Sequence, residues 1–176
     1  RKQKEHEKLL SANSFVADDP AAETTGIWRE STFRPNHIGS HYLVADQGKA
    51  ESLSIKWKIP LPKPGQYEVR VSFGGGQGLE RKAPYVVTHA KGQTELIIDQ
   101  TVKPPINGLW YPIGKFNFAS SQTGKGTDNE KQEPVYAQVE LSNRNTTGPV
   151  IADAIQIVPT GTIKSADQKQ TSKPLL

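Results

Sequence analysis

Apolar and polar residues alternate along several segments of this chain, and that period of two constrains the fold more than any other feature of its sequence. In a strand, successive side chains point to opposite faces, so each segment predicts a strand with one buried and one solvated face. Such strands are typical of antiparallel sheets. The alternating segments are 52–59, 67–73, 116–118 and 135–141. The first segment carries Trp57 on its apolar face, and we expect this side chain to lie in the core.

Further strands are expected at 41–45, 84–89, 93–99 and 150–158. The last two segments are apolar on both faces, which predicts central positions in a sheet. Short runs rich in proline and glycine separate the segments, and no intervening stretch has the periodicity of a helix. Eight to nine short strands of this kind predict an all-β fold. We expect an antiparallel β-sandwich of the jelly-roll or galactose-binding-like type rather than the immunoglobulin type.

The charge of the chain is concentrated at its ends. A formal charge of +4, from 22 basic and 18 acidic residues among 176, would by itself favour an acidic partner such as nucleic acid. Residues 1–10 and 160–176 each carry a net +2, however, and the 15 basic and 15 acidic residues between them cancel. We therefore expect no nucleic-acid partner. No apolar run approaches the ~18 residues of a transmembrane helix, so no membrane span is expected either.

The composition divides the chain into three parts. Residues 1–12 are densely charged, and we expect a linker or the end of an upstream domain there. Residues 13–159 should form the β-sandwich domain, and residues 160–176 lack periodicity and predict a flexible tail. The sequence contains no methionine. We interpret it as a processed chain or as a segment of a longer protein.

No pattern of residues predicts catalysis or a bound cofactor. Cysteine is absent, which excludes disulfides, thiolate metal sites and thiol catalysis, and no serine lies in a nucleophile-elbow pattern. The glycines of 74–78 follow a strand, but the helix that a phosphate loop requires is missing, so we expect an ordinary loop between strands.

The histidines show no pattern that predicts a metal site. His37 and His41 have the i, i+4 spacing of metal ligands on a helix, but Pro35 and Gly39 predict a loop, so no metal site is expected there. His89 stands at the start of a tight turn, which favours a structural role.

Three acidic residues leave more than one interpretation open. Asp18 and Asp19 precede a proline, which favours a role in a turn, although adjacent carboxylates also suit Ca²⁺. Asp153 shares a face with the isoleucines of its segment and should point into or beside the core, where a carboxylate must be paired or hydrogen-bonded. We favour a structural anchor for a loop at Asp153 over a contact with a ligand.

Aromatic residues in loop-like contexts are the candidate binding residues. Trp28, Phe33, Trp110 and Tyr111 do not fall on regular strand faces. Exposed rings can stack on sugars or anchor a protein partner, whereas tryptophan is also well buried on average. Both interpretations stay open for each ring.

The order of motifs along the chain resembles the golvesin C-terminal-like domain, which also occurs in the C-terminal region of xanthan lyases. The resemblance spans about residues 14–159 and departs from the family in a polar insert at 120–133 and in the glycine-rich loop at 74–78. Its motifs are ADD at 17–19, TGIWRES at 25–31, IGSHY at 38–42, LPKPGQYEV at 61–69, APYVVTHAKG at 83–92, GLWYPIG at 108–114 and VIADAI at 150–155.

The resemblance implies a non-catalytic module of bacterial exported or surface enzymes, placed outside the cell, in the periplasm or on the cell surface. It implies binding of polysaccharide or cell-wall material. For that role we expect a contact surface made of Trp28, His41, Arg81, Trp110 and Tyr111. The alternative is a structural module that packs on and stabilises an upstream catalytic domain, such as a polysaccharide lyase, an amidase or a flavin-dependent oxidoreductase. An enzyme in its own right is the third hypothesis.

Overall fold

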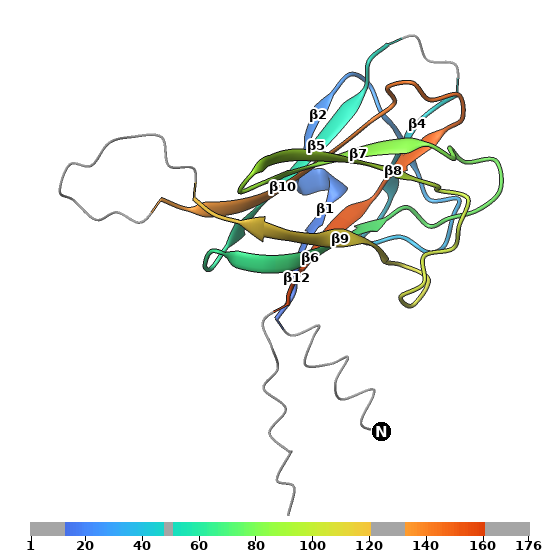
Figure 1. Cartoon of the computed structure of the whole chain (residues 1–176). Helices are drawn as coiled ribbons and strands as arrows, with labels where there is room; N and C mark the ends of the chain where they lie inside the picture. The colour runs from blue at the N-terminus through green and yellow to red at the C-terminus, as the bar shows by residue number, and fades with distance from the viewer. Residues whose placement is uncertain (1–12, 48–50, 121–132, 161–176) are drawn as a thin grey trace, which may run out of the picture.

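The protein is an antiparallel β-sandwich, which confirms the fold class that the alternation predicts (Figure 1). The computed structural model describes residues 13–47, 51–120 and 133–160. The expectations for residues 1–12, for the tail beyond residue 160 and for most of the insert at 120–133 lie outside the described residues. Within the described part, no helix is long and apolar enough to cross a membrane.

Three sheets make up the described fold, and every pairing between their strands is antiparallel. The four-stranded sheet has the order β1 (Phe15–Asp18), β12 (Ala154–Pro159), β6 (Gly65–Ser72) and β9 (Tyr111–Phe118). The five-stranded sheet has the order β2 (Glu23–Thr25), β5 (Ser54–Leu61), β10 (Val135–Ser142), β7 (Ala83–His89) and β8 (Gly92–Ile98). The three-stranded sheet has the order β11 (Val150–Ala152), β4 (Tyr42–Ala45) and β3 (Arg29–Ser31).

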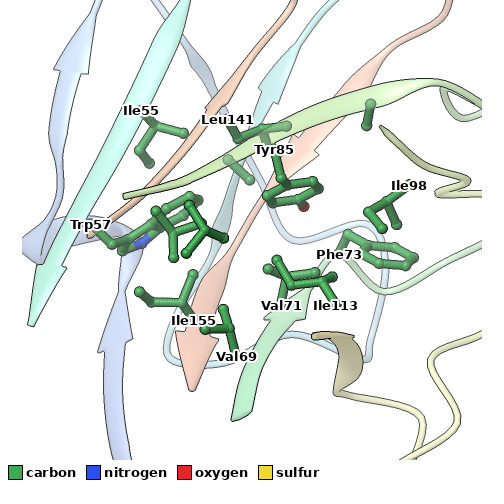
Figure 2. Packing of buried hydrophobic residues seen from close by; sticks show 14 of the residues in the cluster. Ile55, Trp57, Val69, Val71, Phe73, Tyr85, Ile98, Ile113, Leu141 and Ile155 are labelled. Carbon is green, nitrogen blue, oxygen red and sulfur yellow. The ribbon is translucent and has the colours of Figure 1, made fainter. Parts of the chain in front are cut away.

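The core lies between the inward faces of the two larger sheets. Figure 2 shows Trp57 and Tyr85 of the five-stranded sheet packed with Val71 and Ile155 of the four-stranded sheet. Trp57 is 1% exposed. Removal of this apolar surface from water stabilises the sandwich at about 25 cal/mol per Å² buried. The alternation of the sequence therefore corresponds to one dry face on each long strand.

The strand prediction is accurate for the long strands and incomplete for the short ones. The described residues form twelve strands, against the eight to nine predicted. The strands that were missed, β1, β2 and β3, have three or four residues each, which is too short for a period of two to be recognised. The segment 150–158 is divided into β11 and β12 by Asp153.

The expected central position is right for β12 and wrong for 93–99. Residues of β12 are buried on both faces between β1 and β6. Strand β8, in contrast, is an edge strand that pairs with β7 alone, and Ile97 is 52% exposed. An apolar run shows that a strand can be buried on both faces, but the sheet order decides whether neighbours are present to cover it.

Two buried polar side chains connect the loops at one end of the sandwich. Gln100 is fully buried, and its amide donates to the Ile151 carbonyl and accepts from the Ile151 N–H, both at 2.8 Å. Glu80 is 4% exposed; its carboxylate accepts from the N–H groups of Lys82, Thr147 and Gly148 at 2.7–2.8 Å. Burial alone would raise the pKa of Glu80, but the donated backbone hydrogen bonds hold it below its ordinary value.

The first prediction concerns Glu80→Gln, which places an amide nitrogen against N–H groups that now donate to a carboxylate. We expect it to lower the free energy of unfolding at about pH 7 by about 1–3 kcal/mol. The pKa of Glu80 is lower in the folded than in the unfolded state, so its contribution is present above the unfolded pKa and disappears as the pH falls through the folded pKa. The free energies of unfolding of the wild type and of Glu80→Gln should therefore become more similar as the pH falls. Urea unfolding of the two proteins at decreasing pH measures this difference.

The control is Glu140→Gln, which removes a surface carboxylate that lies 3.8 Å from Lys56 Nζ. Its effect should stay within about 0.5 kcal/mol, because exposed ion pairs contribute little. A loss at Glu80 that equals the control, or that does not change with pH, would contradict the role assigned to Glu80.

Candidate functional site

Two of the predicted binding residues, Trp28 and His41, line the same cavity of about 480 Å³. We call it the Trp28–His41 cavity. It lies beside the short 3-10 helix η1 (Asp19–Ala21), and its wall also includes Thr24, Glu30 and Asp19. The cavity therefore combines an indole ring, an imidazole, two carboxylates and a hydroxyl group. Such a mixture of one aromatic surface and several hydrogen-bonding groups is typical of small-molecule and sugar sites.

Trp28 is held in place by a hydrogen bond to the five-stranded sheet. Its Nε1–H donates to the carbonyl of Ser54, the first residue of β5, at 3.2 Å. The side chain is half-buried and packs against the core, so part of the ring remains accessible at the cavity. This bond fixes the orientation of the ring before any ligand is bound, which lowers the entropic cost of binding.

His41 connects the cavity to a buried carboxylate. Its Nε2 lies 2.9 Å from Asp19 Oδ2 and its Nδ1 lies 3.1 Å from Ser40 Oγ. A neutral imidazole satisfies both contacts when Nε2–H donates to Asp19 and Nδ1 accepts from Ser40. The carboxylate of Glu30 is 3.8 Å from the same Nε2 and is largely exposed to solvent. His41 is thus oriented from both sides.

Asp19 belongs to a cluster of three carboxylates with Asp18 and Asp153, which we call the carboxylate cluster. One oxygen from each residue lies within 4.8 Å of the other two. Asp153 is 1% exposed, and it accepts hydrogen bonds from Ser72 Oγ at 2.6 Å and from the Ile38 N–H at 3.0 Å. This carboxylate therefore connects the loop before β4 to the end of β6.

The electrostatics of the cluster are unfavourable for three negative charges. Burial is the largest cause and the neighbouring Asp18 carboxyl the next in raising the pKa of Asp19 to about 7. The nearby His41 acts in the opposite direction. Burial also raises the pKa of Asp153 to about 6, although Ser72 and the Ile38 N–H donate to it. The cluster needs a compensating positive charge or a proton near neutral pH.

The other predicted binding residues do not line this cavity. Trp110 is 7% exposed, so of the two interpretations left open for its ring the structure favours burial. Tyr111 packs against Phe73 with ring centroids 5.7 Å apart. Arg81 is exposed and its guanidinium lies 4.0 Å from Asp99. Of the five residues expected at a contact surface, the Trp28–His41 cavity therefore brings together two.

The three histidines considered in the sequence analysis have different partners. His37 Nδ1 lies 2.7 Å from the Arg34 carbonyl, and its ring contacts Tyr42, whereas His41 faces Asp19. His89 stacks on Phe116 with centroids 5.5 Å apart. The i, i+4 spacing of His37 and His41 does not bring both rings to one point, because the loop between them has no helical turn.

The glycine-rich loop at 74–78 follows β6 and leads to another strand, β7, with no helix between them. The guanidinium of Arg34 donates to the Gly75 carbonyl at 3.0 Å and to the Gln77 carbonyl at 3.4 Å. Carbonyl groups and not N–H groups therefore meet the positive charge, which is opposite to the arrangement of a phosphate loop.

Glu30 and Thr24 are the site residues that sequence reasoning missed. They lie on β3 and β2, two of the short strands without a recognisable period. The adjacent carboxylate of Asp18 made Asp19 recognisable in the sequence as a possible ligand residue. No sequence pattern indicated that Asp19 would contact His41. These contacts arise only when strands distant in the sequence pair.

The fold is a β-sandwich of the architecture seen in solved carbohydrate-binding modules. The chain belongs to the Golvesin C-terminal domain family, which matches residues 15–159. The family assignment thus agrees with the resemblance carried by the ordered motifs of the sequence.

The relatives include much larger proteins. A xanthan lyase of Bacillus sp. (strain GL1) is 26% identical over 145 residues, which are 82% of this chain but only 14% of that protein. The solved Paenibacillus xanthan lyase is 19% identical with a TM-score of 0.66, covering 83% of this chain and 13% of that one. A family 35 carbohydrate-binding module from an environmental isolate is 16% identical with a TM-score of 0.50, covering 84% of this chain and 94% of that one.

The second prediction concerns Trp110→Ala. Because Trp110 is covered by the fold, we expect the substitution to lower the free energy of unfolding by about 3–5 kcal/mol, as large-to-small changes of buried aromatic residues do. Phe33→Ala is the matched control, since Phe33 is 88% exposed and its removal should have little effect. Urea unfolding measures both variants. Similar stability of the two variants would show that Trp110 is not part of the packed structure.

Proposed function

We propose that this chain is a non-catalytic accessory module that binds polysaccharide and serves a larger exported or cell-surface bacterial enzyme. The observation that carries the proposal is the Trp28–His41 cavity on a fold shared with carbohydrate-binding modules. The half-buried indole ring of Trp28 supplies a flat apolar face for a pyranose ring. The carboxylate of Glu30 supplies acceptors and the hydroxyl of Thr24 supplies a donor and an acceptor for its hydroxyl groups, while the ring of His41 forms part of the same wall.

The charge of the cavity suggests which sugars it accepts. Its wall carries the carboxylates of Glu30 and Asp19, while its nearest basic group is the imidazole of His41. An acidic sugar would meet like charges there, whereas a neutral sugar can donate hydroxyl hydrogens to the carboxylates. We therefore propose a neutral sugar unit of a polysaccharide as the group that enters the cavity.

The accessory role is supported by the sizes of the relatives. The chain corresponds to 14% of one xanthan lyase and 13% of another, so in those proteins a similar domain is attached to a much longer chain. A tethered binding module raises the effective concentration of its catalytic partner at the substrate. An enzyme that degrades polysaccharide meets its substrate outside the cytoplasm, and we propose the same location for this module.

The third prediction concerns Trp28→Ala, tested with the isolated chain by affinity electrophoresis on xanthan, a β-1,4-mannan and a dextran. The wild type should be retarded by at least one of them, and Trp28→Ala should bind that polysaccharide about tenfold or more weakly because the stacking surface is lost. Glu30→Gln, an exposed change at the same cavity, tests the site without altering the core.

The matched control is Tyr136→Ala, because Tyr136 is exposed on β10 and lies outside the Trp28–His41 cavity. It should bind as the wild type does, and thermal unfolding shows whether each variant remains folded. Equal losses at Tyr136 and Trp28 would contradict the assignment of the cavity. If the wild type binds none of the polysaccharides, and removing the module lowers the melting temperature of the full-length parent enzyme, the structural role is supported instead.

A further inference from the structure

The carboxylate cluster is assembled by the pairing of the first and last strands of the sandwich. Asp18 ends β1 and lies opposite Ala154 of β12, so that Asp153, the residue before β12, is brought to its side. Asp19 opens η1 directly after β1. Asp18 thus comes from a strand, Asp19 from the helix that follows it, and Asp153 from the single residue between β11 and β12. Such a fixed arrangement of like charges needs a physical explanation.

The spacing of the carboxylates matches the coordination sphere of a calcium ion. Oxygen ligands bind Ca²⁺ at about 2.3–2.6 Å, so two oxygens of one sphere lie at most about 5 Å apart. The three carboxylate oxygens of the cluster all lie within 4.8 Å of one another. This spacing is compatible with contact of all three residues to a single ion.

The cluster lacks a basic side chain that would neutralise it. Among the described residues, no lysine or arginine forms an ion pair with Asp18, Asp19 or Asp153. Asp19 contacts the imidazole of His41, and Asp153 also interacts electrostatically with His37. The other donors to the cluster are backbone N–H groups and the hydroxyl of Ser72. Two buried carboxylates and a half-buried third with so little positive charge are costly unless a cation or protons are bound.

A separate observation is the unsatisfied oxygen of Asp19. The side chain of Asp19 is 2% exposed, and its Oδ1 is buried with no hydrogen-bond partner among the described residues, whereas Oδ2 faces His41. A buried carboxylate oxygen without a donor loses its hydrogen bonds to water, and no hydrogen bond within the protein replaces them. A bound cation would satisfy it directly.

We propose that Asp18, Asp19 and Asp153 bind a hard divalent cation, with Ca²⁺ as the expected ion. The donor set consists of oxygen atoms, which favour Ca²⁺ over softer metals such as Zn²⁺. Mg²⁺ is disfavoured because it requires closer octahedral contacts and gives up its bound water reluctantly. Backbone or water oxygens would complete the coordination.

The loop from 37 to 41 lies over the cluster and connects it to the Trp28–His41 cavity. Gly39 has a φ of +68°, and a Cβ there would lie 2.0 Å from Asp18 Oδ2, so a side chain is excluded where the loop approaches the carboxylate. Ile38 donates to Asp153 and His41 contacts Asp19. A cation at the cluster would hold both ends of this loop and thereby fix His41 in the cavity wall.

The fourth prediction is tested by isothermal titration calorimetry, in which CaCl₂ is added to the full chain. The protein is first freed of metal by EDTA and then dialysed. We expect one Ca²⁺ per chain and a rise in melting temperature with Ca²⁺ that Mg²⁺ does not match at equal concentration. Asp18→Asn and Asp153→Asn should weaken Ca²⁺ binding about tenfold or more, because each removes one anionic ligand. No saccharide is present, so the result stands independently of the proposed function.

The matched control is Glu23→Gln, which changes an exposed carboxylate on β2 outside the cluster and should leave Ca²⁺ binding unchanged. The wild-type titration decides the question even if a cluster variant fails to fold. Absence of Ca²⁺ binding and of a thermal shift up to about 10 mM, above the range of weak extracellular sites, would overturn the proposal. Unchanged binding in folded Asp18→Asn and Asp153→Asn would overturn it as well.

Discussion

The antiparallel pairing of β1 with β12 is the interaction on which the candidate sites of this module depend. It places the start of the described sandwich beside its end and brings Asp18 next to Asp153. Asp19 follows immediately and reaches His41, which lines the same cavity as Trp28. Disruption of this single pairing would separate the carboxylate cluster and remove one wall of the Trp28–His41 cavity.

Buried polar side chains give the loops of the sandwich a defined position, whereas apolar packing alone would not. Hydrophobic contacts are non-directional, so they hold the two sheets together but do not orient the connections between strands. Glu80, Gln100 and Asp153 each accept hydrogen bonds from the backbone of a distant segment. Because an unpaired buried donor is costly, each of these contacts selects one arrangement of its loop.

The comparisons and the structure support different parts of the functional argument. The family match shows what kind of domain this is, and identities of 16–26% to the relatives described here establish the sandwich without transferring a binding site. The site must be argued from side chains. In this chain a fixed indole ring, an oriented imidazole and two nearby carboxylates at one cavity support the proposed binding site.

The sequence by itself determined the sandwich, because the period of two is a local property that marks the buried face of every long strand. It also singled out Trp28 and His41, but it could not show that Trp110 is covered or that 93–99 forms an edge strand. Those outcomes, the meeting of Asp19 with His41 and the cluster itself were decided by the tertiary structure. The physical reason is that these contacts join residues far apart in the chain, and only the order of strands in the sheets brings them within hydrogen-bonding distance.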